Sequence, residues 1–339
     1  IDIVEGLVEY CLENEKFEDA HEFCKLWIEY FPYSFDAWNK QAGILINLEK
    51  YPEALNAINK ALSFDPGDPE ALTNKAIILD YEGRAAEAKI YIDKALTLDP
   101  ENDETLLHKG IILESLGDYG QALEIFKYLS DSGKMVSTAL QELAFCSNAL
   151  GKTEEAISYY KIAIDEDPFN MDLWYNLGMI YNDLSKHYKA IDCFDMAIAI
   201  DDFYQPAWYA RGSSYSQLGR LHDAAESYRK SIELRSDDAD SWHNLASALG
   251  DSGEYMEAIE AFSEAIRLEP AHYRSFFGRG ICYDAVEDYE KAILDYDSAL
   301  MFKSDLADIW YAKADALYNY GKAKDSLECY SRVLSIFPD

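Results

Sequence analysis

The chain of 339 residues is poor in basic side chains. It has 30 Lys and Arg against 63 Asp and Glu, which gives a formal net charge of −33 at pH 7. This surplus of acid disfavours a nucleic-acid backbone or an anionic membrane surface as the main partner. Hydrophobic residues nevertheless make up 49% of the sequence and aromatic residues 14%, far more than a disordered acidic tail carries. We therefore expect a folded protein that binds no nucleic acid.

Long apolar runs and targeting signals are also missing. No stretch reaches the roughly eighteen apolar residues of a membrane span, and no basic segment followed by an apolar one marks a signal peptide. We therefore expect a soluble, cytoplasmic protein without direct membrane binding. The chain begins at Ile1 without an initiator Met and ends at Asp339, so we also expect flanking segments beyond these residues.

Signatures of catalysis and of metal or cofactor binding are absent as well. The cysteines include no C-x-x-C pair, the histidines show no H-x₃-H or H-E-x-x-H spacing, and no glycine-rich phosphate loop or G-x-S-x-G motif occurs. Carboxylates are too numerous for any pair to indicate acid–base catalysis. We predict no enzyme activity, no cofactor and no metal site. Rather than a disulfide framework or metal site, we expect reduced thiols in the core at Cys11, Cys24, Cys146, Cys193, Cys282 and Cys329.

The chain contains an internal repeat of 34 residues. An alanine recurs at this spacing at Ala20, Ala54, Ala88, Ala122, Ala156, Ala190, Ala224, Ala258 and Ala292, and the next step falls on Ser326. Twelve residues after this position, a proline that can end a helix occurs as Pro32, Pro66, Pro100, Pro168, Pro270 and Pro338. Ten repeats without insertions therefore account for the whole chain: 1–34, 35–68, 69–102, 103–136, 137–170, 171–204, 205–238, 239–272, 273–306 and 307–339.

These repeats resemble the tetratricopeptide repeat, a helix–turn–helix unit with the signature W-x₂-L-G-x₂-Y, A-x₃-F and P. Repeat 6 carries this signature as Trp174, Leu177, Gly178, Tyr181, Ala190 and Phe194. The resemblance covers all 339 residues. It implies an all-α fold: a single domain, 1–339, forming a right-handed superhelical solenoid of about twenty antiparallel helices.

Small residues at fixed places predict how the two helices of a repeat pack. Counted from the start of a repeat, position 8 is Gly or Ala in nine repeats, which lets the helices approach closely. Position 15 is often Gly, which suits a left-handed residue at the end of the first helix. Position 7 holds Lys75, Lys109, Arg211, Arg279 and Lys313. A basic ladder for an anionic ligand is one interpretation, but we favour stems that cover the neighbouring helix and head groups that reach carboxylates.

The opposite face of the first helix is the candidate binding surface. Positions 2, 6, 9 and 13 lie about 180° from the packing stripe, flanked by positions 5 and 12, and the resemblance implies that this face lines a concave groove. Apolar side chains on a face that should be polar indicate either a ligand or packing between adjacent repeats. The predicted peptide-binding residues are Asn74, Ile77, His108, Ile111, Phe145, Tyr175, Asn176, Met179, Tyr209, His243, Asn244, Phe277 and Tyr311.

Polar residues of this face predict the chemistry of the ligand. The amides at position 6 can donate to and accept from a peptide backbone, although Glu142, Ala210, Gly278 and Ala312 interrupt the series. Carboxylates line the same face at Glu9, Glu13, Asp80, Glu114, Asp183, Asp251 and Asp284. They predict a partner in which Lys or Arg alternates with apolar side chains, the alternative being a solvated acidic surface.

The leading hypothesis is a non-enzymatic scaffold or adaptor that binds a basic and apolar segment of a protein or peptide in its concave groove. A second hypothesis is a self-assembly module or multiprotein platform, including a homo-oligomer, that uses the C-terminal end, where Leu327, Tyr330, Val333 and Leu334 leave apolar surface. A third is the substrate-recruiting arm of a larger enzyme whose catalytic domain lies outside residues 1–339. Position 5 never carries Lys or Arg, so the clamp that the family uses for acidic chaperone tails is not expected.

Overall fold

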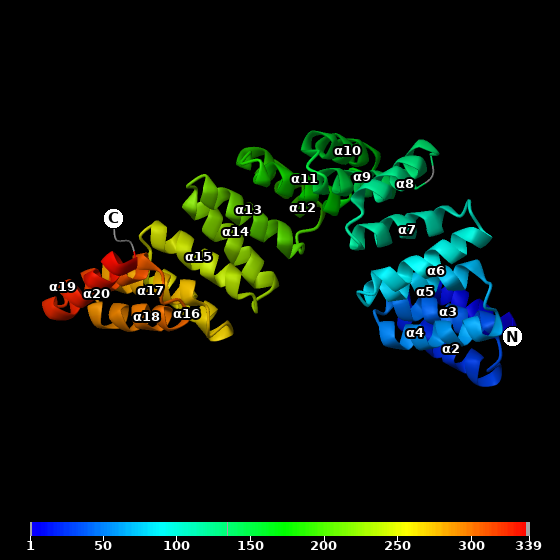
Figure 1. Cartoon of the computed structure of the whole chain (residues 1–339), viewed down its shortest axis with the longest axis horizontal. Helices are drawn as coiled ribbons and strands as arrows, with labels where there is room; N and C mark the ends of the chain where they lie inside the picture. Colours follow the sequence, from blue (N-terminus) through cyan, green and yellow to red (C-terminus); the bar gives the residue numbers. More distant parts are fainter. Residues whose placement is uncertain (1, 134, 337–339) are drawn as a thin grey trace. The chain divides into compact units, whose positions relative to one another are not determined.

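The computed structural model describes residues 2–133 and 135–336 and has two helices in each repeat (Figure 1). The all-α prediction is confirmed. No described helix is long and apolar enough to cross a membrane. The helices are α1 (Asp2–Glu13), α2 (Phe17–Tyr30), α3 (Phe35–Asn47), α4 (Tyr51–Phe64), α5 (Pro69–Tyr81), α6 (Ala85–Leu98), α7 (Asp103–Ser115), α8 (Tyr119–Asp131), α9 (Val136–Ala149), α10 (Thr153–Glu166), α11 (Met171–Asp183), α12 (His187–Ile200), α13 (Gln205–Gln217), α14 (Leu221–Leu234), α15 (Ala239–Asp251), α16 (Tyr255–Leu268), α17 (Tyr273–Ala285), α18 (Tyr289–Phe302), α19 (Ala307–Asn319) and α20 (Ala323–Ile336).

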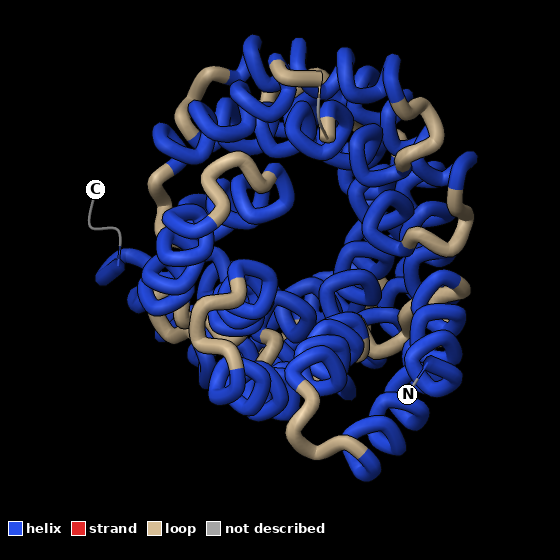
Figure 2. The backbone as a smooth tube through the Cα atoms, turned by 90° about the vertical axis from the view of Figure 1, so that its right-hand side faces the viewer, coloured by secondary structure: helices blue, strands red, loops and turns tan. Residues whose placement is uncertain are grey.

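The helices group into two compact units, Ile1–Pro168 and Phe169–Asp339. In both units the first helix of a repeat packs on its own second helix and on the second helix of the preceding repeat, as α3 packs on α4 and α5 on α4. Short loops join the helices (Figure 2). Successive first helices, such as α5 and α7 or α15 and α17, also contact one another. The first helices therefore gather on one side of each unit, called its inner face here. That all ten repeats form one continuous solenoid stays a prediction.

A left-handed residue at position 15 ends the first helix in all ten repeats. The glycines there have φ between 70° and 89°: Gly83, Gly117, Gly151, Gly219, Gly253 and Gly321. The other four repeats place Glu15, Glu49, Ser185 and Glu287 in the same region, with φ between 55° and 62°. The next amide closes the turn, as the N–H of Arg84 donates to the carbonyl of Leu79 at 2.8 Å. The turn therefore forms in every repeat, even where the residue at position 15 is not glycine and its left-handed backbone is strained.

Side-chain caps and prolines set the other helix ends. A side-chain oxygen accepts a hydrogen bond from a backbone N–H of the first helical turn at Ser34, Asp68 and Asn102, over 3.2, 2.7 and 2.9 Å. At the far end of the repeat, proline comes two residues after the last helical residue at Pro32, Pro66, Pro100, Pro168 and Pro270. The expected Pro338 lies outside the described residues. Helix boundaries in these repeats therefore follow local capping chemistry.

Close packing at position 8 is confirmed. A Cβ added to Gly178 would lie 2.6 Å from Cε1 of Phe194, whose side chain is fully buried. The same fit pairs Gly110 with Phe126, Gly212 with Tyr228 and Gly280 with Tyr296. Phe262, whose own repeat has Ala246 at position 8, also lies over Gly278 of the next repeat, where an added Cβ would lie 2.4 Å from its ring. Aromatic rings at position 24 thus lie against glycines.

The position-7 cations cover the neighbouring helix, as predicted. Four of them reach a carboxylate: Lys109 to Asp93 at 2.8 Å, Arg211 to Asp195 at 2.7 Å, Arg279 to Asp295 at 2.7 and 2.8 Å, and Lys313 to Asp297 at 2.5 Å. Lys75 instead reaches the amide oxygen of Asn59 at 2.7 Å. Three of the carboxylates, and Asn59, occupy position 25 of the preceding repeat. These cations are therefore part of the packing between repeats.

The six cysteines lie in the core, as predicted, and each is a free thiol. Burial raises the pKa of Cys24 to about 12 and that of Cys282 to about 11. Because the thiolate is the reactive form, these buried thiols are unreactive near neutral pH.

Candidate functional site

The inner face of the first unit combines apolar side chains with amides. Phe145 on α9 is 46% exposed, and the centre of its ring lies 6.2 Å from the centre of the Tyr119 ring. Ile77 on α5 is buried and Ile111 on α7 is half-buried. Packing between repeats therefore explains why Ile77 and Ile111 are apolar, whereas the exposed ring of Phe145 can contact solvent or a ligand.

An amide pair lies beside these side chains. Nδ2 of Asn74 donates to Oδ1 of Asn39 at 3.2 Å, and Nδ2 of Asn39 donates to Oε1 of Glu70 at 2.9 Å. The carbonyl oxygen and the second N–H of Asn74 have no side-chain partner among the described residues, and these are the two groups that pair with a peptide backbone.

A group of carboxylates lies on the same face without a basic partner among the described residues. Sγ of Cys146 donates to Oε1 of Glu114 at 2.9 Å. Burial raises the pKa of Glu114 to about 7, and the charges of Glu142 and Asp80 add to the effect. Burial also raises the pKa of Glu142 and of Asp80. No described Lys or Arg is among the groups that shift these pKa values.

The remaining neighbours do not neutralise this group. Ser115 donates its hydroxyl to Oδ2 of Asp80 at 3.2 Å, while the buried Oδ1 has no hydrogen-bond partner in the part of the chain that the structure describes. Burial lowers the pKa of His108, so its imidazole is neutral near pH 7. The inner face of the first unit therefore has uncompensated negative charge next to an exposed aromatic ring.

In the second unit the aromatic series at position 5 packs within its own repeats. Each ring lies 5.5 to 5.9 Å, centre to centre, from the ring at position 24 of the same repeat. These pairs are Tyr175–Phe194, Tyr209–Tyr228, His243–Phe262, Phe277–Tyr296 and Tyr311–Tyr330. Tyr311 is still 53% exposed, whereas the other four position-5 rings are half-buried. Intramolecular packing thus explains much of this series.

Polar groups of the second unit are partly engaged as well. Nδ2 of Asn244 donates to the hydroxyl of Tyr209 at 2.8 Å. Nδ1 of His243 lies 3.0 Å from Oγ of Ser275, and burial lowers the pKa of His243 to about 4. Asn176 has no hydrogen-bond partner within the described ranges, and Met179 beside it is half-buried. Only part of the amide series is therefore free to pair with a ligand.

The other predicted carboxylates are not among the groups that shift the pKa of Glu114. Burial raises the pKa of Asp284, with the charge of Asp315 adding to it. The exposed predicted carboxylates are Glu9, Glu13, Asp183 and Asp251. Of these four, Glu9 lies 3.5 Å from Nζ of Lys40.

On α20, Leu327 is 65% exposed and Leu334 67%. Val333 and Tyr330 are half-buried, and the hydroxyl of Tyr330 donates to Asp315. Self-assembly through these side chains stays a prediction.

Comparison with protein families identifies the repeats. Models described as tetratricopeptide repeat match residues 35–68, 69–102, 138–170, 172–204 and 243–306, and one described as TPR repeat matches residues 212–253. Together the matches cover more than half of the chain. The chain belongs to the tetratricopeptide repeat family. Proteins of this family are generally non-enzymatic scaffolds for protein interactions, and their partners are proteins or peptides.

Solved structures of other tetratricopeptide repeat proteins resemble the chain. One from Parabacteroides merdae is 19% identical with a TM-score of 0.50, over 74% of this chain and 98% of that one, which shows the fold alone. MamA from Desulfovibrio magneticus is 17% identical, with a TM-score of 0.48 over 50% and 95% of the two chains. YrrB, described as a TPR protein with an unusual peptide-binding site, is 18% identical, with a TM-score of 0.49 over 53% and 93%. No curated protein matches the chain.

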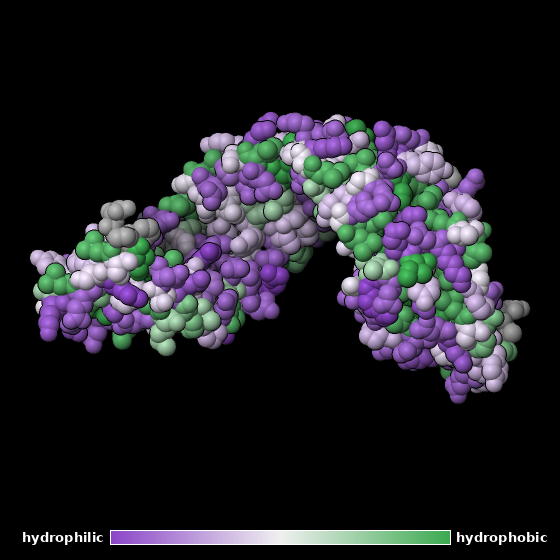
Figure 3. Space-filling view, viewed as in Figure 1, coloured by the Kyte–Doolittle hydropathy of each residue, from purple (hydrophilic) through white to green (hydrophobic). Residues whose placement is uncertain are grey.

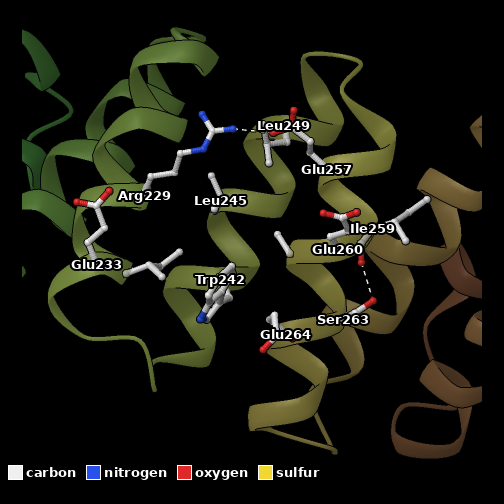
Figure 4. A pocket seen from close by; sticks show the side chains of 12 residues that line it. Arg229, Glu233, Trp242, Leu245, Leu249, Glu257, Ile259, Glu260, Ser263 and Glu264 are labelled. Atoms are coloured by element: carbon white, nitrogen blue, oxygen red, sulfur yellow. Dashed lines mark hydrogen bonds and ion pairs between the residues drawn. The ribbon is translucent and has the colours of Figure 1, made fainter.

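Two features of this tetratricopeptide repeat chain are not apparent from its sequence. Glu142 interrupts the amide series in the sequence, but the structure places it near Glu114. The sequence could have indicated this contact only through the repeat frame, in which Glu114 is at position 12 of one repeat and Glu142 at position 6 of the next. The second feature is a hollow in the second unit, lined by α14, α15 and α16 (Figure 4). Hydrophobic side chains reach the surface among hydrophilic ones in both units (Figure 3), so hydropathy alone does not identify it.

Proposed function

We propose that the inner face of repeats 3 to 5, formed by α5, α7 and α9, binds an extended segment of a partner protein in which Lys or Arg adjoins an apolar side chain. The observation that carries this proposal is the half-buried carboxylate of Glu114, which has Glu142 and Asp80 as charged neighbours and no cation among the described residues that act on it. The chain would then act as a non-enzymatic scaffold.

A cation from the partner would remove an electrostatic cost that the free protein bears. Between half-buried carboxylates, a Lys or Arg head group favours their ionised forms and forms charge-assisted hydrogen bonds. The aliphatic stem of the same side chain, or an apolar neighbour, can cover Phe145. The free carbonyl and N–H of Asn74 can pair with the main chain of the segment.

The inner face of the second unit offers a second set of contacts of the same kind. Asn176 supplies a free amide beside Met179, and Tyr311 supplies an exposed ring. We propose that these residues bind apolar side chains and backbone of a partner segment. The half-buried Tyr175, Tyr209, His243 and Phe277 would contribute ring edges that their own repeats leave uncovered.

Capture from cell lysate by the immobilised chain tests this function. We compare wild type with Glu114→Gln/Glu142→Gln, which removes two inner-face carboxylates but keeps shape, and with Glu124→Gln/Glu154→Gln, which removes two carboxylates from exposed positions. A partner bound through the inner face should be weakened about tenfold by the first variant and little by the second. Its affinity for wild type should fall as pH drops below 7, because Glu114 then takes up a proton.

Equal capture by wild type and by the inner-face variant would contradict the proposal. So would a captured partner whose affinity does not change between pH 8 and pH 6, since the carboxylate of Glu114 loses charge over this interval.

A further inference from the structure

The packing of the position-7 cations shows what the outer side of each repeat can bind. Arg211 lies 4.3 Å from the centre of the Trp208 ring and 2.7 Å from Oδ1 of Asp195. Lys313 likewise lies 5.4 Å from the Trp310 ring and contacts Asp297. We call this place the outer notch: it lies between the ring at position 4, the second helix of the preceding repeat and the second helix of the same repeat. In these repeats the chain fills its own notch with a cation held by a ring and a carboxylate.

Repeat 8 lacks this internal cation but keeps the ring. Position 7 is Leu245, and position 25 of the preceding repeat is Arg229 instead of an acid. Nε1 of Trp242 donates to the carbonyl of Ser236 at 3.0 Å, just as Nε1 of Trp208 donates to the carbonyl of Asp202 at 2.9 Å. The Trp242 ring is therefore held as in the filled notches. Arg229 forms an ion pair with Glu257 instead, in which Nη2 lies 2.8 Å from Oε2.

The notch of repeat 8 is open and acidic. It forms a cavity of about 960 Å³ between α14, α15 and α16 (Figure 4). Its floor is apolar and buried, with Leu245, Leu249 and Ala261 at 5%, 2% and 4% exposure. Its rim carries Glu257, Glu260 and Glu264 at positions 19, 22 and 26, and no other repeat has acids at all three positions.

These rim carboxylates differ in what they already bind. Glu257 pairs with Arg229, and Glu264 pairs with Arg267 at 2.7 Å. Glu260 has no ion-pair partner among the described residues and is exposed on the rim. The notch thus has a positioned ring, an apolar floor and an unpaired carboxylate, and only the cation is missing.

We propose that the outer notch of repeat 8 is a second docking site, which takes a Lys or Arg side chain of a partner protein together with an adjacent aliphatic side chain. The cation lies over Trp242 and pairs with Glu260, while the aliphatic side chain covers Leu245 and Leu249. Charge complementarity selects this occupant, because four glutamates, including Glu233, line the notch against one arginine. The site is formed by other residues than the proposed peptide-binding surface and does not depend on it.

Fluorine NMR of the chain labelled with 5-fluorotryptophan tests the site, with the Trp242 signal assigned through Trp242→Phe. The probe is a capped Leu-Arg-Leu tripeptide, and the control probe carries citrulline, which has the shape of arginine without its charge. We expect the arginine peptide to shift the Trp242 signal saturably and the citrulline peptide to shift it much less. Equal shifts with both probes, or none with either, would overturn the proposal.

Two variants sharpen the test. Glu260→Gln removes the unpaired carboxylate from an exposed position and should weaken the arginine peptide about fivefold. Arg229→Asp/Leu245→Lys copies the Asp297–Lys313 pair of repeat 10, so the chain should fill its own notch and the Trp242 signal should no longer respond. The melting temperature checks that this variant stays folded.

Unchanged affinity in Glu260→Gln would overturn the site, as would a wild-type response in the filled variant. The inner-face variant Glu114→Gln/Glu142→Gln should leave the Trp242 response unchanged. A failure of the outer notch and a failure of the proposed inner-face function are therefore distinguishable.

Discussion

Replacing Glu114 with glutamine should stabilise the protein at high pH and have little effect at low pH. The carboxyl of Glu114 ionises with a pKa of about 7 in the folded state, against 4.5 for the ordinary side chain. Between these values the folded state binds more protons than the unfolded state, so the stability due to this group falls as pH rises. Below about pH 4.5 both states are protonated and the penalty vanishes.

The size of the effect follows from the pKa difference. At about 1.36 kcal/mol per pKa unit, a rise from 4.5 to about 7 corresponds to about 3 kcal/mol above pH 7. Because Glu114 is only half-buried, relaxation and water reduce this figure, and we expect about 2 kcal/mol. A glutamine side chain at this position does not ionise, so it avoids this penalty, and it can still accept the hydrogen bond from Cys146.

The measurement should be local, since repeat arrays open in segments. Hydrogen exchange of the amides in α7 and α9, corrected for the intrinsic pH dependence, gives the opening free energy at pH 5 and pH 8. Glu124→Gln, at an exposed position of α8, controls for the change in net charge. Equal protection of Glu114→Gln and wild type at pH 8, or the same gain at pH 5 as at pH 8, would refute the reasoning.

Three further predictions concern a close helix contact, a strained turn residue and an ion pair. Gly178→Ala should destabilise the chain by about 1–3 kcal/mol in urea unfolding, because the added Cβ would overlap the facing aromatic ring. Gly43→Ala is the control: it has open space around it and should stabilise the chain by up to about 1 kcal/mol. Glu287→Gly should raise stability by about 1 kcal/mol, since φ is 62° there. Asp295→Ala leaves the guanidinium of Arg279 without its bidentate partner and should cost about 2–3 kcal/mol; restoration by Arg279→Met/Asp295→Leu would confirm the cause.

Much of the fold could be predicted because each contact that shapes a repeat recurs every 34 residues. The glycine at position 8, for example Gly178, predicts a close helix pair, and the structure fills the space with the ring of Phe194. Gly83 predicts a left-handed turn that Glu15 also adopts without any local preference for it. There the stacking of whole repeats overrides the residue's own conformational preference.

The candidate site was harder to predict because it depends on the offset between neighbouring repeats. Phe262 packs on His243 of its own repeat and also lies over Gly278 of the next, which no pattern within one repeat indicates. The approach of Glu142 to Glu114 likewise depends on how far α9 is shifted along α7. The pKa of about 7 at Glu114 then arises from burial, which a sequence does not measure.

In a repeat protein, the filled copies of a feature serve as internal controls for the copy that differs. The notches of repeats 7 and 10 contain an acid at position 25 and a cation at position 7, as Asp195 with Arg211 shows. Repeat 8 changes both positions together, to Arg229 and Leu245, yet keeps the tryptophan and its hydrogen bond. A loss of the cation alone would be a packing variation. Repeat 8 instead keeps the tryptophan ring and adds acids at the rim. This combination distinguishes a notch that a partner's cation can fill from a repeat that has lost the notch.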